Sequence, residues 1–336
     1  MTVVTNLLEI DRLSVQYRTA RGPLTAVDEA CFNVPPGSVV GLVGESGCGK
    51  TTLARAVMGV MPRTATVSGA ARFMGHDLVS MPARDRREKL WRKLAFIPQT
   101  AMSALDPVYR VGAQISEVLT ERGGFSRAAA RARAEELFGM VGLALPTLDH
   151  YPHQFSGGMR QRASIAIALA LDPALVLADE PVTALDVIVQ RQVLDTLRGL
   201  QARLGLSVVL VTHDISVVAY ACDLVVVMYA GRVVESGPVA EVLERPRHPY
   251  TMGLTHAFPD LDSAGGTLVP IEGAPPALDP PPPGCRFAPR CPFALPRCAT
   301  EEPPLVQAGD HASACWRSPE AATLRDDAAK VGTWSR

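Results

Sequence analysis

The sequence predicts an α/β protein, and three observations support that fold class. Short apolar runs with the length of buried strands, at residues 38–43 and 175–178, lead into glycine-rich or acidic residues and then into helical stretches. Alternating apolar residues between Leu7 and Val34 indicate an antiparallel β subdomain that enters the core. The residues from about 100 to 172 are largely helical in pattern and predict an inserted helical subdomain.

A glycine-rich turn follows the first of these runs. Its glycines Gly44, Gly47 and Gly49 let the backbone turn tightly, so that successive N–H groups point at one anion. A helix is expected to start near Lys50, and its N-terminal dipole favours the same negative charge. Lys50 would reach the β- and γ-phosphates of a nucleotide, and the Thr51 hydroxyl would ligate Mg²⁺. The eight matched positions favour a phosphate-binding loop over a chance glycine-rich turn. The nucleotide-binding residues expected here are Gly44, Ser46, Gly47, Cys48, Gly49, Lys50, Thr51 and Thr52.

The run at residues 175–178 delivers two carboxylates, Asp179 and Glu180, at its C-terminal end. Ligands gather outside the carboxyl ends of strands in open α/β sheets, so both side chains are expected beside the phosphates. Asp179 would hold Mg²⁺, directly or through water, and Glu180 would orient and deprotonate the attacking water. An acidic pair that only caps a strand is the alternative, and the complete phosphate-binding loop makes it the weaker one.

A second phosphate-reading motif, FSGGM from Phe155, follows about a hundred residues after the first. Ser156 suits a helix N-cap, and Gly157 and Gly158 permit close approach to an anion. One triphosphate does not need two such cradles, so we expect a head-to-tail pair of chains in which each completes the other's site. Small-residue packing at a helix start is the alternative.

Further helices and strands are expected around these motifs. Ser126 can cap an alanine- and arginine-rich helix over residues 127–140. Apolar residues at helical spacing within 189–204 predict a helix that packs this stripe into the core. Residues 208–211 form an apolar strand, and residues 224–235 are typical of two strands joined by a tight turn.

Together the motifs resemble those of the ATP-binding subunits of ABC transporters, over about residues 7–250 and in the family's order. The segments that carry the resemblance are GESGCGKT from Gly44, Gln99, FSGGM from Phe155, LVLADE from Leu175, Ala184-Leu185-Asp186, and His213. The resemblance implies a P-loop NTPase with a RecA-like core, ATP and Mg²⁺ as ligands, and an ATPase coupled to transport.

The resemblance also implies four further roles. Gln99 would sense the γ-phosphate through Mg²⁺ and water, and would couple the site to membrane subunits. His213 would contact the γ-phosphate, and Asp186 would help to link the two sites across the dimer. Tyr17 would stack on adenine. Without the resemblance, His213 would be a surface histidine at a strand end, and Tyr17 a half-buried strand aromatic.

Three residues depart from the common family form. Phe155 and Met159 stand where leucine and glutamine are most frequent, and Val182 stands where many relatives carry threonine. None of these changes removes a group expected to touch phosphate, because the Ser-Gly-Gly core of the second motif is intact. Working hydrolysis is therefore expected.

The C-terminal residues indicate which group of ABC transporters the chain resembles. They contain HPYT from His248, a proline run near Pro280, and four cysteines in a short polar stretch. These cysteines are Cys285, Cys291, Cys298 and Cys315. The tail resembles the C-terminal extension of oligopeptide and dipeptide importer ATPases, among whose relatives some import nickel. We therefore expect an ATP-binding domain at 1–250 and an irregular Cys-rich extension at 251–336.

The four cysteines suggest a staple, because the extension is too small to bury a core of its own. Disulfides are disfavoured, since no signal peptide is visible in residues 1–9 and a cytosolic chain keeps thiols reduced. Zinc favours paired C-x₂-C ligands, and this spacing is wider. Thiolates also hold iron–sulfur clusters, and the resemblance implies a [4Fe-4S] cluster in some relatives. The cluster is favoured, with zinc or no metal as alternatives. The other cysteines are interpreted as small core or loop residues, and these are Cys31, Cys48 and Cys222.

Composition excludes two classes of function. A formal net charge of −1 offers no general attraction to nucleic acid. No apolar run approaches the roughly 20 residues of a spanning helix, so a membrane role would depend on partners. The resemblance implies those partners: a second ATP-binding subunit, identical or related, two membrane permease subunits and an extracytoplasmic solute-binding protein. The chain would then lie peripherally at the cytoplasmic face of the cell membrane.

The expected function is ATP hydrolysis that energises an importer of di- or oligopeptides through ATP-driven dimerisation. An importer of nickel or another solute is one alternative. A soluble ABC ATPase without a transport role is another, but DNA repair predicts a long coiled-coil insertion and iron–sulfur assembly predicts no such tail. A phosphotransferase would need an acceptor, and ATP hydrolysis without one would exclude it.

Overall fold

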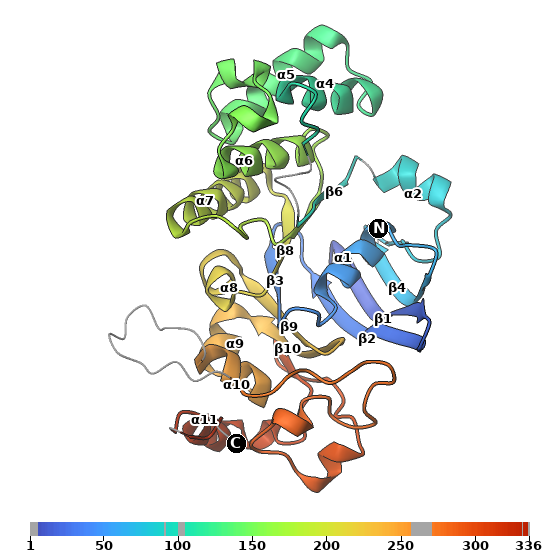
Figure 1. Ribbon diagram of the computed structural model, residues 1–336, viewed down its shortest axis with the longest axis vertical. Helices are drawn as coiled ribbons and strands as arrows, with labels where there is room; N and C mark the ends of the chain where they lie inside the picture. The colour runs from blue at the N-terminus through green and yellow to red at the C-terminus, as the bar shows by residue number, and fades with distance from the viewer. Residues whose placement is uncertain (1–5, 91, 100–104, 257–270, 331, 335–336) are drawn as a thin grey trace.

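The structure is a computed structural model that covers most of the chain. The residues it describes are 6–90, 92–99, 105–256, 271–330 and 332–334. In Figure 1 the molecule is elongated, with helices α4 (Val111–Glu121), α5 (Arg127–Met140) and α6 (Gly157–Ala168) at one end. The C-terminal residues form the opposite end, and two β-sheets lie between. Residues 100–104, with which the predicted helical subdomain begins, and 257–270 of the tail lie outside the described part.

The larger sheet forms the centre of the molecule. Its strands are β3 (Val39–Val43), β6 (Leu94–Ile97), β7 (Leu175–Asp179), β8 (Ser207–Thr212), β9 (Leu224–Tyr229), β10 (Arg232–Pro238), β11 (Val306–Ala308) and β12 (His311–Ser313). They are ordered β11-β12-β10-β9-β3-β8-β7-β6, and β9 to β6 run parallel. Every residue of β3, β7 and β8 is buried, as expected for parallel strands covered on both faces. The predicted strands of the core are confirmed.

The smaller sheet is antiparallel and confirms the predicted β subdomain. Its strands are β1 (Leu8–Thr19), β2 (Gly22–Val34), β4 (Ala65–Phe73) and β5 (His76–Asp77), in the order β2-β1-β4-β5. Apolar residues of β1 and β2, among them Leu13, Val15 and Val27, are fully buried. They pack in one cluster with Leu53 and Val57 of the helix that follows β3.

The part of the chain that the structure describes contains seven more α-helices. They are α1 (Lys50–Met58), α2 (Ala83–Leu90), α7 (Val187–Leu204), α8 (Ile215–Ala221), α9 (Val239–Glu244), α10 (Pro249–His256) and α11 (Ala321–Ala328). Helix α1 begins at the predicted residue, and α5 occupies the predicted range because the Ser126 hydroxyl accepts the Ala129 N–H at 3.3 Å. The α7 stripe is core as predicted at Val193, Leu197 and Leu200, whereas Leu204 is exposed at the helix end.

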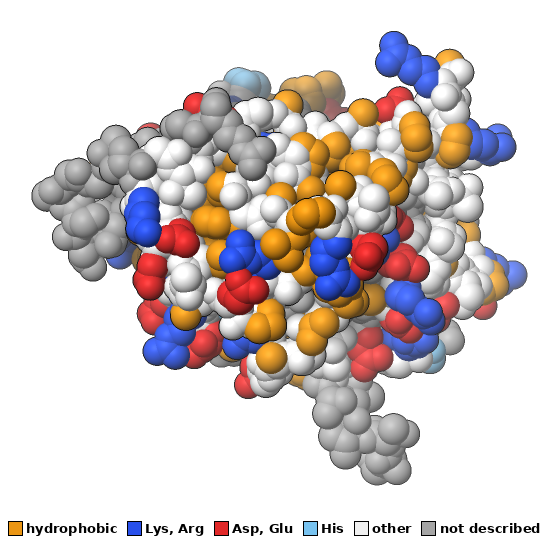
Figure 2. Space-filling view, turned by 90° about the horizontal axis from the view of Figure 1, so that it is seen from below, with side chains coloured by type: hydrophobic (Ala, Val, Ile, Leu, Met, Phe, Trp, Pro, Cys, Tyr) orange, Lys and Arg blue, Asp and Glu red, His pale blue; other side chains and the backbone are white. Residues whose placement is uncertain are grey.

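The tail is more regular than expected and continues the main sheet. Strand β12 pairs antiparallel with β10, and α10 spans the predicted boundary at residue 250. The carboxylate of Glu235 in β10 is fully buried and accepts hydrogen bonds from His311 Nε2 at 2.6 Å and from the His248 N–H at 3.0 Å. Figure 2 shows the face at this end, where hydrophobic side chains cross the middle between charged ones.

Candidate functional site

The loop between β3 and α1 is pressed against the rest of the fold. A Cβ at Gly44 would lie 2.1 Å from the Met228 carbonyl oxygen, and one at Gly49 would lie 2.3 Å from that of Ala26. Both glycines also have positive φ, of 157° and 104°. The loop therefore requires glycine at these positions, as the sequence predicted, while Ser46 and its neighbour at the loop tip are exposed.

Lys50 is buried at the start of α1 and turns back over the loop. Its Nζ donates to the carbonyl oxygens of Gly44 at 2.7 Å and Glu45 at 2.9 Å. The side chain of Cys48, within the loop, is buried, and burial raises the pKa of its thiol above the usual value despite the nearby Lys50 charge. A lysine ammonium group at a glycine-rich turn that leads into a helix N-terminus is an arrangement that binds phosphate in proteins.

Thr51 and Asp179 meet at the carboxyl edge of the main sheet. The Thr51 hydroxyl donates to Asp179 Oδ1 at 3.1 Å. Asp179 is buried, and its Oδ2 has no hydrogen-bond partner among the described residues. Burial raises the pKa of Asp179, and the charge of Glu180 adds to this effect. A hydroxyl beside a buried carboxylate with a spare oxygen fits a Mg²⁺ site, because this ion takes oxygen ligands.

Glu180 is held in an uncommon backbone conformation. Its φ is 47°, in the left-handed region, and its N–H donates to the Val211 carbonyl of β8 at 2.8 Å. This turn lets Glu180 and its neighbour Asp179 face the same site although they are adjacent on the chain. The structure thus shows how two adjacent carboxylates can face one site at the end of a strand.

Three side chains donate to or pair with the Glu180 carboxylate. Gln99 Nε2 donates to Oε2 at 2.9 Å, the Thr183 hydroxyl donates to Oε2 at 3.1 Å, and His213 Nδ1 lies 3.0 Å from Oε1. Burial raises the pKa of Glu180, but these contacts, His213 foremost, outweigh it and leave the pKa below the usual value. Glu180 is therefore an ionised acceptor, which suits a group that takes a proton from water.

Thr183 was not among the predicted site residues. Its place three residues after Glu180, in the turn that leads to α7, is a usable signal because a hydroxyl at that spacing can fold back onto the carboxylate. Tyr17, in contrast, lies where the sequence placed it. It is half-buried near the end of β1, and its hydroxyl donates to that of Thr52 at 3.4 Å, beside the first turn of α1.

The second motif lies at the start of α6. The Ser156 hydroxyl accepts the Met159 N–H at 3.3 Å and is exposed, so the predicted N-cap is confirmed. A Cβ at Gly158 would lie 2.4 Å from a methyl group of Val189, which shows how closely α6 packs on α7. Phe155 is buried, so the departure from leucine fills core space.

The structure does not bring this motif to the phosphate-binding loop of the same chain. Figure 1 places α6 beside α4 and α5, away from α1. Among the described residues, no hydrogen bond or ion pair links Ser156 or Gly158 to the loop. Asp186 caps α7 by accepting the Val189 N–H at 2.9 Å, and it is exposed, followed by the exposed apolar residues Val187 and Ile188.

The four cysteines of the tail gather around one small cavity of ≈20 Å³. Burial raises the pKa of Cys285 and Cys315 to about 11 and that of Cys291 to about 12. All seven cysteines lie in the described part of the chain, and none of them forms a disulfide. No group of three or more His, Cys, Asp or Glu within the described ranges is placed to hold a metal ion, so neither the predicted iron–sulfur cluster nor a zinc site gains support from this arrangement.

Two protein families match the chain. The family described as ABC transporter matches residues 27–183, and the one described as oligopeptide/dipeptide transporter, C-terminal region, matches residues 234–298. Among the helices that the structure describes, none has the length and apolar character needed to cross a membrane.

Several curated proteins are similar over most of the chain. An oligopeptide transport ATP-binding protein of Mycobacterium tuberculosis is 47% identical over 93% of this chain, which spans only 52% of that protein. A probable peptide ABC transporter ATP-binding protein of Sinorhizobium fredii is 43% identical, covering 95% of this chain and 97% of its own length. An oligopeptide transport ATP-binding protein of Bacillus subtilis is 40% identical, covering 98% and 92%.

Solved structures of ABC proteins resemble part of this chain. The dimeric, post-hydrolysis ATP-binding cassette MJ0796 bound to ADP and Pi has a TM-score of 0.62 and 26% identity, and covers 69% of this chain and 98% of its own. The structure of cbiO1 from Clostridium perfringens, part of the ABC transporter complex cbiONQ, has a TM-score of 0.61 and 26% identity, and covers 71% of this chain and 91% of its own.

Proposed function

This chain belongs to the ABC transporter family, among the ATP-binding proteins of peptide transport, and from this premise we propose that it hydrolyses ATP to energise a peptide importer. One observation carries the proposal. Lys50, Thr51, Asp179, Glu180 and His213 meet at the carboxyl ends of the adjacent parallel strands β3, β8 and β7. A phosphate cradle, a cation site and an ionised base are thereby combined at one edge of the sheet.

The chemistry follows from the side chains. The loop N–H groups and Lys50 hold the phosphates, and Thr51 with Asp179 would hold Mg²⁺, which adds positive charge beside the phosphates when bound. Glu180 orients the attacking water and accepts its proton. Gln99 contacts one carboxylate oxygen of Glu180 and His213 contacts the other, and together they orient the carboxylate. Both side chains are exposed and could contact the γ-phosphate.

Two chains are proposed to share each nucleotide. The exposed N-terminus of α6, with Ser156 and Gly157, offers N–H groups to an anion but faces no phosphate of its own chain. A head-to-tail partner, a second copy or a related subunit, would place this terminus over the loop. The exposed residues Asp186, Val187 and Ile188 at the start of α7 would then lie in the interface.

Coupling to a membrane permease is proposed at an apolar cavity lined in part by strand β6, which precedes Gln99 in the chain. The cavity measures ≈480 Å³ and lies between the end of α1, strand β6 and the helical subdomain. Its apolar lining residues include Met58, Phe96, Val118, Ile167 and Leu171. Since β6 ends two residues before Gln99, a permease segment in this cavity would sense the state of the site.

Substrate and location rest on the relatives. Their names specify oligopeptide or peptide transport, so a peptide delivered by an extracytoplasmic solute-binding protein is the proposed cargo, with nickel as the alternative. Two permease subunits would span the membrane, and this chain would bind them at the cytoplasmic face. We divide it into an ATP-binding domain at 1–250 and an extension at 251–336.

For the extension we propose a [4Fe-4S] cluster on Cys285, Cys291, Cys298 and Cys315. Support comes from four thiols that line a single cavity and from their number, since such clusters take four thiolates. A cluster is larger than a single ion, so its ligands stand further apart than those of zinc. Iron and sulfide measured in protein isolated without oxygen, and lost in Cys291→Ser, test this point.

Two variants test ATP hydrolysis. Lys50→Ala removes the ammonium group from the phosphate cradle and should abolish nucleotide binding in a direct titration, whereas Lys330→Ala, an exposed surface change, should not. Glu180→Gln keeps the size of the side chain but not its basicity, so ATP should bind and trap a closed dimer without turnover. Nucleotide affinity unchanged by Lys50→Ala, or turnover unchanged by Glu180→Gln, would refute the assignment.

A further inference from the structure

The C-terminal extension holds one residue of the phosphate-binding loop directly. Arg290 forms a bidentate ion pair with Glu45, from Nη1 to Oε2 at 2.9 Å and from Nη2 to Oε1 at 3.0 Å. The hydroxyl of Tyr250 in α10 accepts the Glu45 main-chain N–H at 3.0 Å. Glu45 lies between Gly44 and Ser46, so the loop is anchored at a side chain and at its backbone.

These anchors are themselves fixed. The Arg290 side chain is 6% exposed and also donates to the Tyr229 hydroxyl at 3.2 Å and to the Ile271 carbonyl at 3.1 Å. Tyr250 is fully buried, with its ring 4.6 Å from that of Tyr229. Charge-assisted bidentate pairs define geometry more strictly than single contacts, so Arg290 sets where Glu45 can lie.

The position of Glu45 matters for the lysine that binds phosphate. The Glu45 carbonyl accepts Lys50 Nζ at 2.9 Å and the Cys48 N–H at 3.2 Å. A displaced Glu45 would therefore displace both the loop backbone and Lys50.

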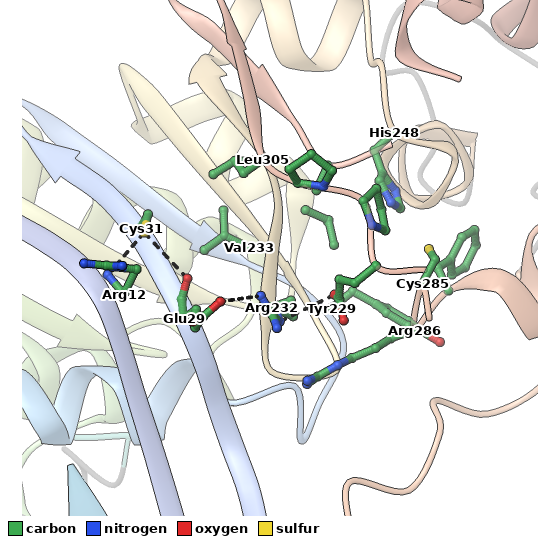
Figure 3. A pocket seen from close by; sticks show the side chains of 16 residues that line it. Arg12, Glu29, Cys31, Tyr229, Arg232, Val233, His248, Cys285, Arg286 and Leu305 are labelled. Carbon is green, nitrogen blue, oxygen red and sulfur yellow. Dashed lines mark hydrogen bonds and ion pairs between the residues drawn. The ribbon is translucent and has the colours of Figure 1, made fainter. Parts of the chain in front are cut away.

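A second arginine of the extension, Arg286, contacts the turn that hydrogen-bonds to the phosphate-binding loop. Arg286, labelled beside Cys285 in Figure 3, donates to the Ala230 carbonyl at 2.5 Å and pairs with Asp28. The next residue, Gly231, donates its N–H to the Cys48 carbonyl at 3.0 Å. Arg286 follows Cys285 and Arg290 precedes Cys291 in the chain. The cysteine segment is therefore linked to the loop through the hydrogen bonds and ion pairs of these two arginines.

We propose that Arg290 and Tyr250 are positioning residues for ATP, through which the extension sets the conformation of the phosphate-binding loop. The proposal rests on the ATP binding proposed above and adds that affinity depends on Arg290, a residue outside the nucleotide-binding domain. The physical reason is preorganisation: a loop already fixed by Glu45 loses less freedom when phosphate binds. The contact between Arg290 and Glu45 stabilises bound ATP equally in the ground state and in the transition state. Its loss should therefore raise KM and leave kcat unchanged.

The test measures ATP affinity and the kinetics of hydrolysis in the full-length protein. Arg290→Met and Tyr250→Phe should each weaken ATP binding about tenfold and raise KM in parallel, with kcat nearly unchanged. Arg290→Lys keeps the charge but not the fork, so its affinity should lie between those of wild type and Arg290→Met.

Glu45→Gln separates positioning from charge. Removing a negative charge beside a triphosphate should tighten binding if only electrostatics count. If Arg290 acts by positioning Glu45, Glu45→Gln should instead weaken ATP binding about as much as Arg290→Met does. The double variant with both substitutions should then bind ATP no more weakly than either single variant. The double variant removes both charges of the ion pair and leaves no buried charge unpaired. It therefore shows whether weaker ATP binding by a single variant comes from misfolding caused by an unpaired charge.

Arg297→Met is the matched control, because Arg297 also precedes a cysteine but pairs with Glu301 at the surface. Its ATP affinity should equal that of wild type. Affinity within about twofold of wild type for folded Arg290→Met, or tighter binding by Glu45→Gln, would overturn the inference while Lys50→Ala still loses nucleotide. If Lys50→Ala keeps its nucleotide, the proposed function itself fails.

Discussion

Glu180 shows how a single residue is prepared for chemistry. It carries a positive φ, little exposed side-chain area and three polar neighbours on its carboxylate. Burial alone would favour the protonated acid, which cannot accept a proton from water. The hydrogen bonds from Thr183, Gln99 and His213 reverse that effect and keep the pKa of Glu180 below its usual value.

The Thr183 contact gives a prediction about pH. Burial raises the pKa of Glu180, and the hydrogen bond from Thr183 is one of the contacts that lower it. Thr183→Val removes this donor, so the pKa of Glu180 should rise. The base is then protonated at higher pH than in wild type, and the acid limb of the kcat profile should move to higher pH while the neutral-pH rate changes little. An acid limb that stays in place in Thr183→Val would argue against Glu180 as the base.

At the scale of elements, local signals were enough to predict most helices and strands. Ser126 and Ser156 cap α5 and α6 because a serine hydroxyl reaches an N–H three residues on, a rule that needs no tertiary information. The same local reasoning reaches Thr183, three residues after Glu180, but it could not find Arg290 at Glu45. Those two residues are far apart in sequence, and only the folded extension brings them together.

The α6–α7 contact gives a prediction about stability. Gly158→Ala places a methyl group 2.4 Å from Val189 and should destabilise the fold by about 1–3 kcal/mol in urea unfolding. Gly199→Ala in α7 meets no atom within 4 Å and should instead stabilise it by about 0.5–1 kcal/mol. Equal effects of the two substitutions would show that α6 does not pack on α7 as described.

At the scale of the whole molecule, the predicted α/β core and antiparallel sheet are confirmed, and helices α4, α5 and α6 lie within the range predicted for a helical subdomain, while the tail differs from expectation. The irregular extension proves to supply β12 to the main sheet and to hold the phosphate-binding loop. Pairing between β10 and β12 joins residues about eighty positions apart, and no local pattern in either strand specifies that register.

The arrangement of the whole molecule also separates the second motif, at the start of α6, from the phosphate-binding loop. Ser156 and the phosphate-binding loop lie in different parts of one chain, so ATP would need the α6 terminus of a partner. Binding would then favour the closed pair by the difference in affinity between closed and open states, and hydrolysis would remove that preference.

The most direct measurement is the ATP hydrolysis rate per chain as the protein is diluted, with a second chain added back. We predict that the rate per chain falls on dilution and recovers when excess Lys50→Ala protein supplies an intact Ser156 terminus, but not when that donor also carries Ser156→Arg. A rate per chain that stays at its full value at every dilution would contradict the shared site.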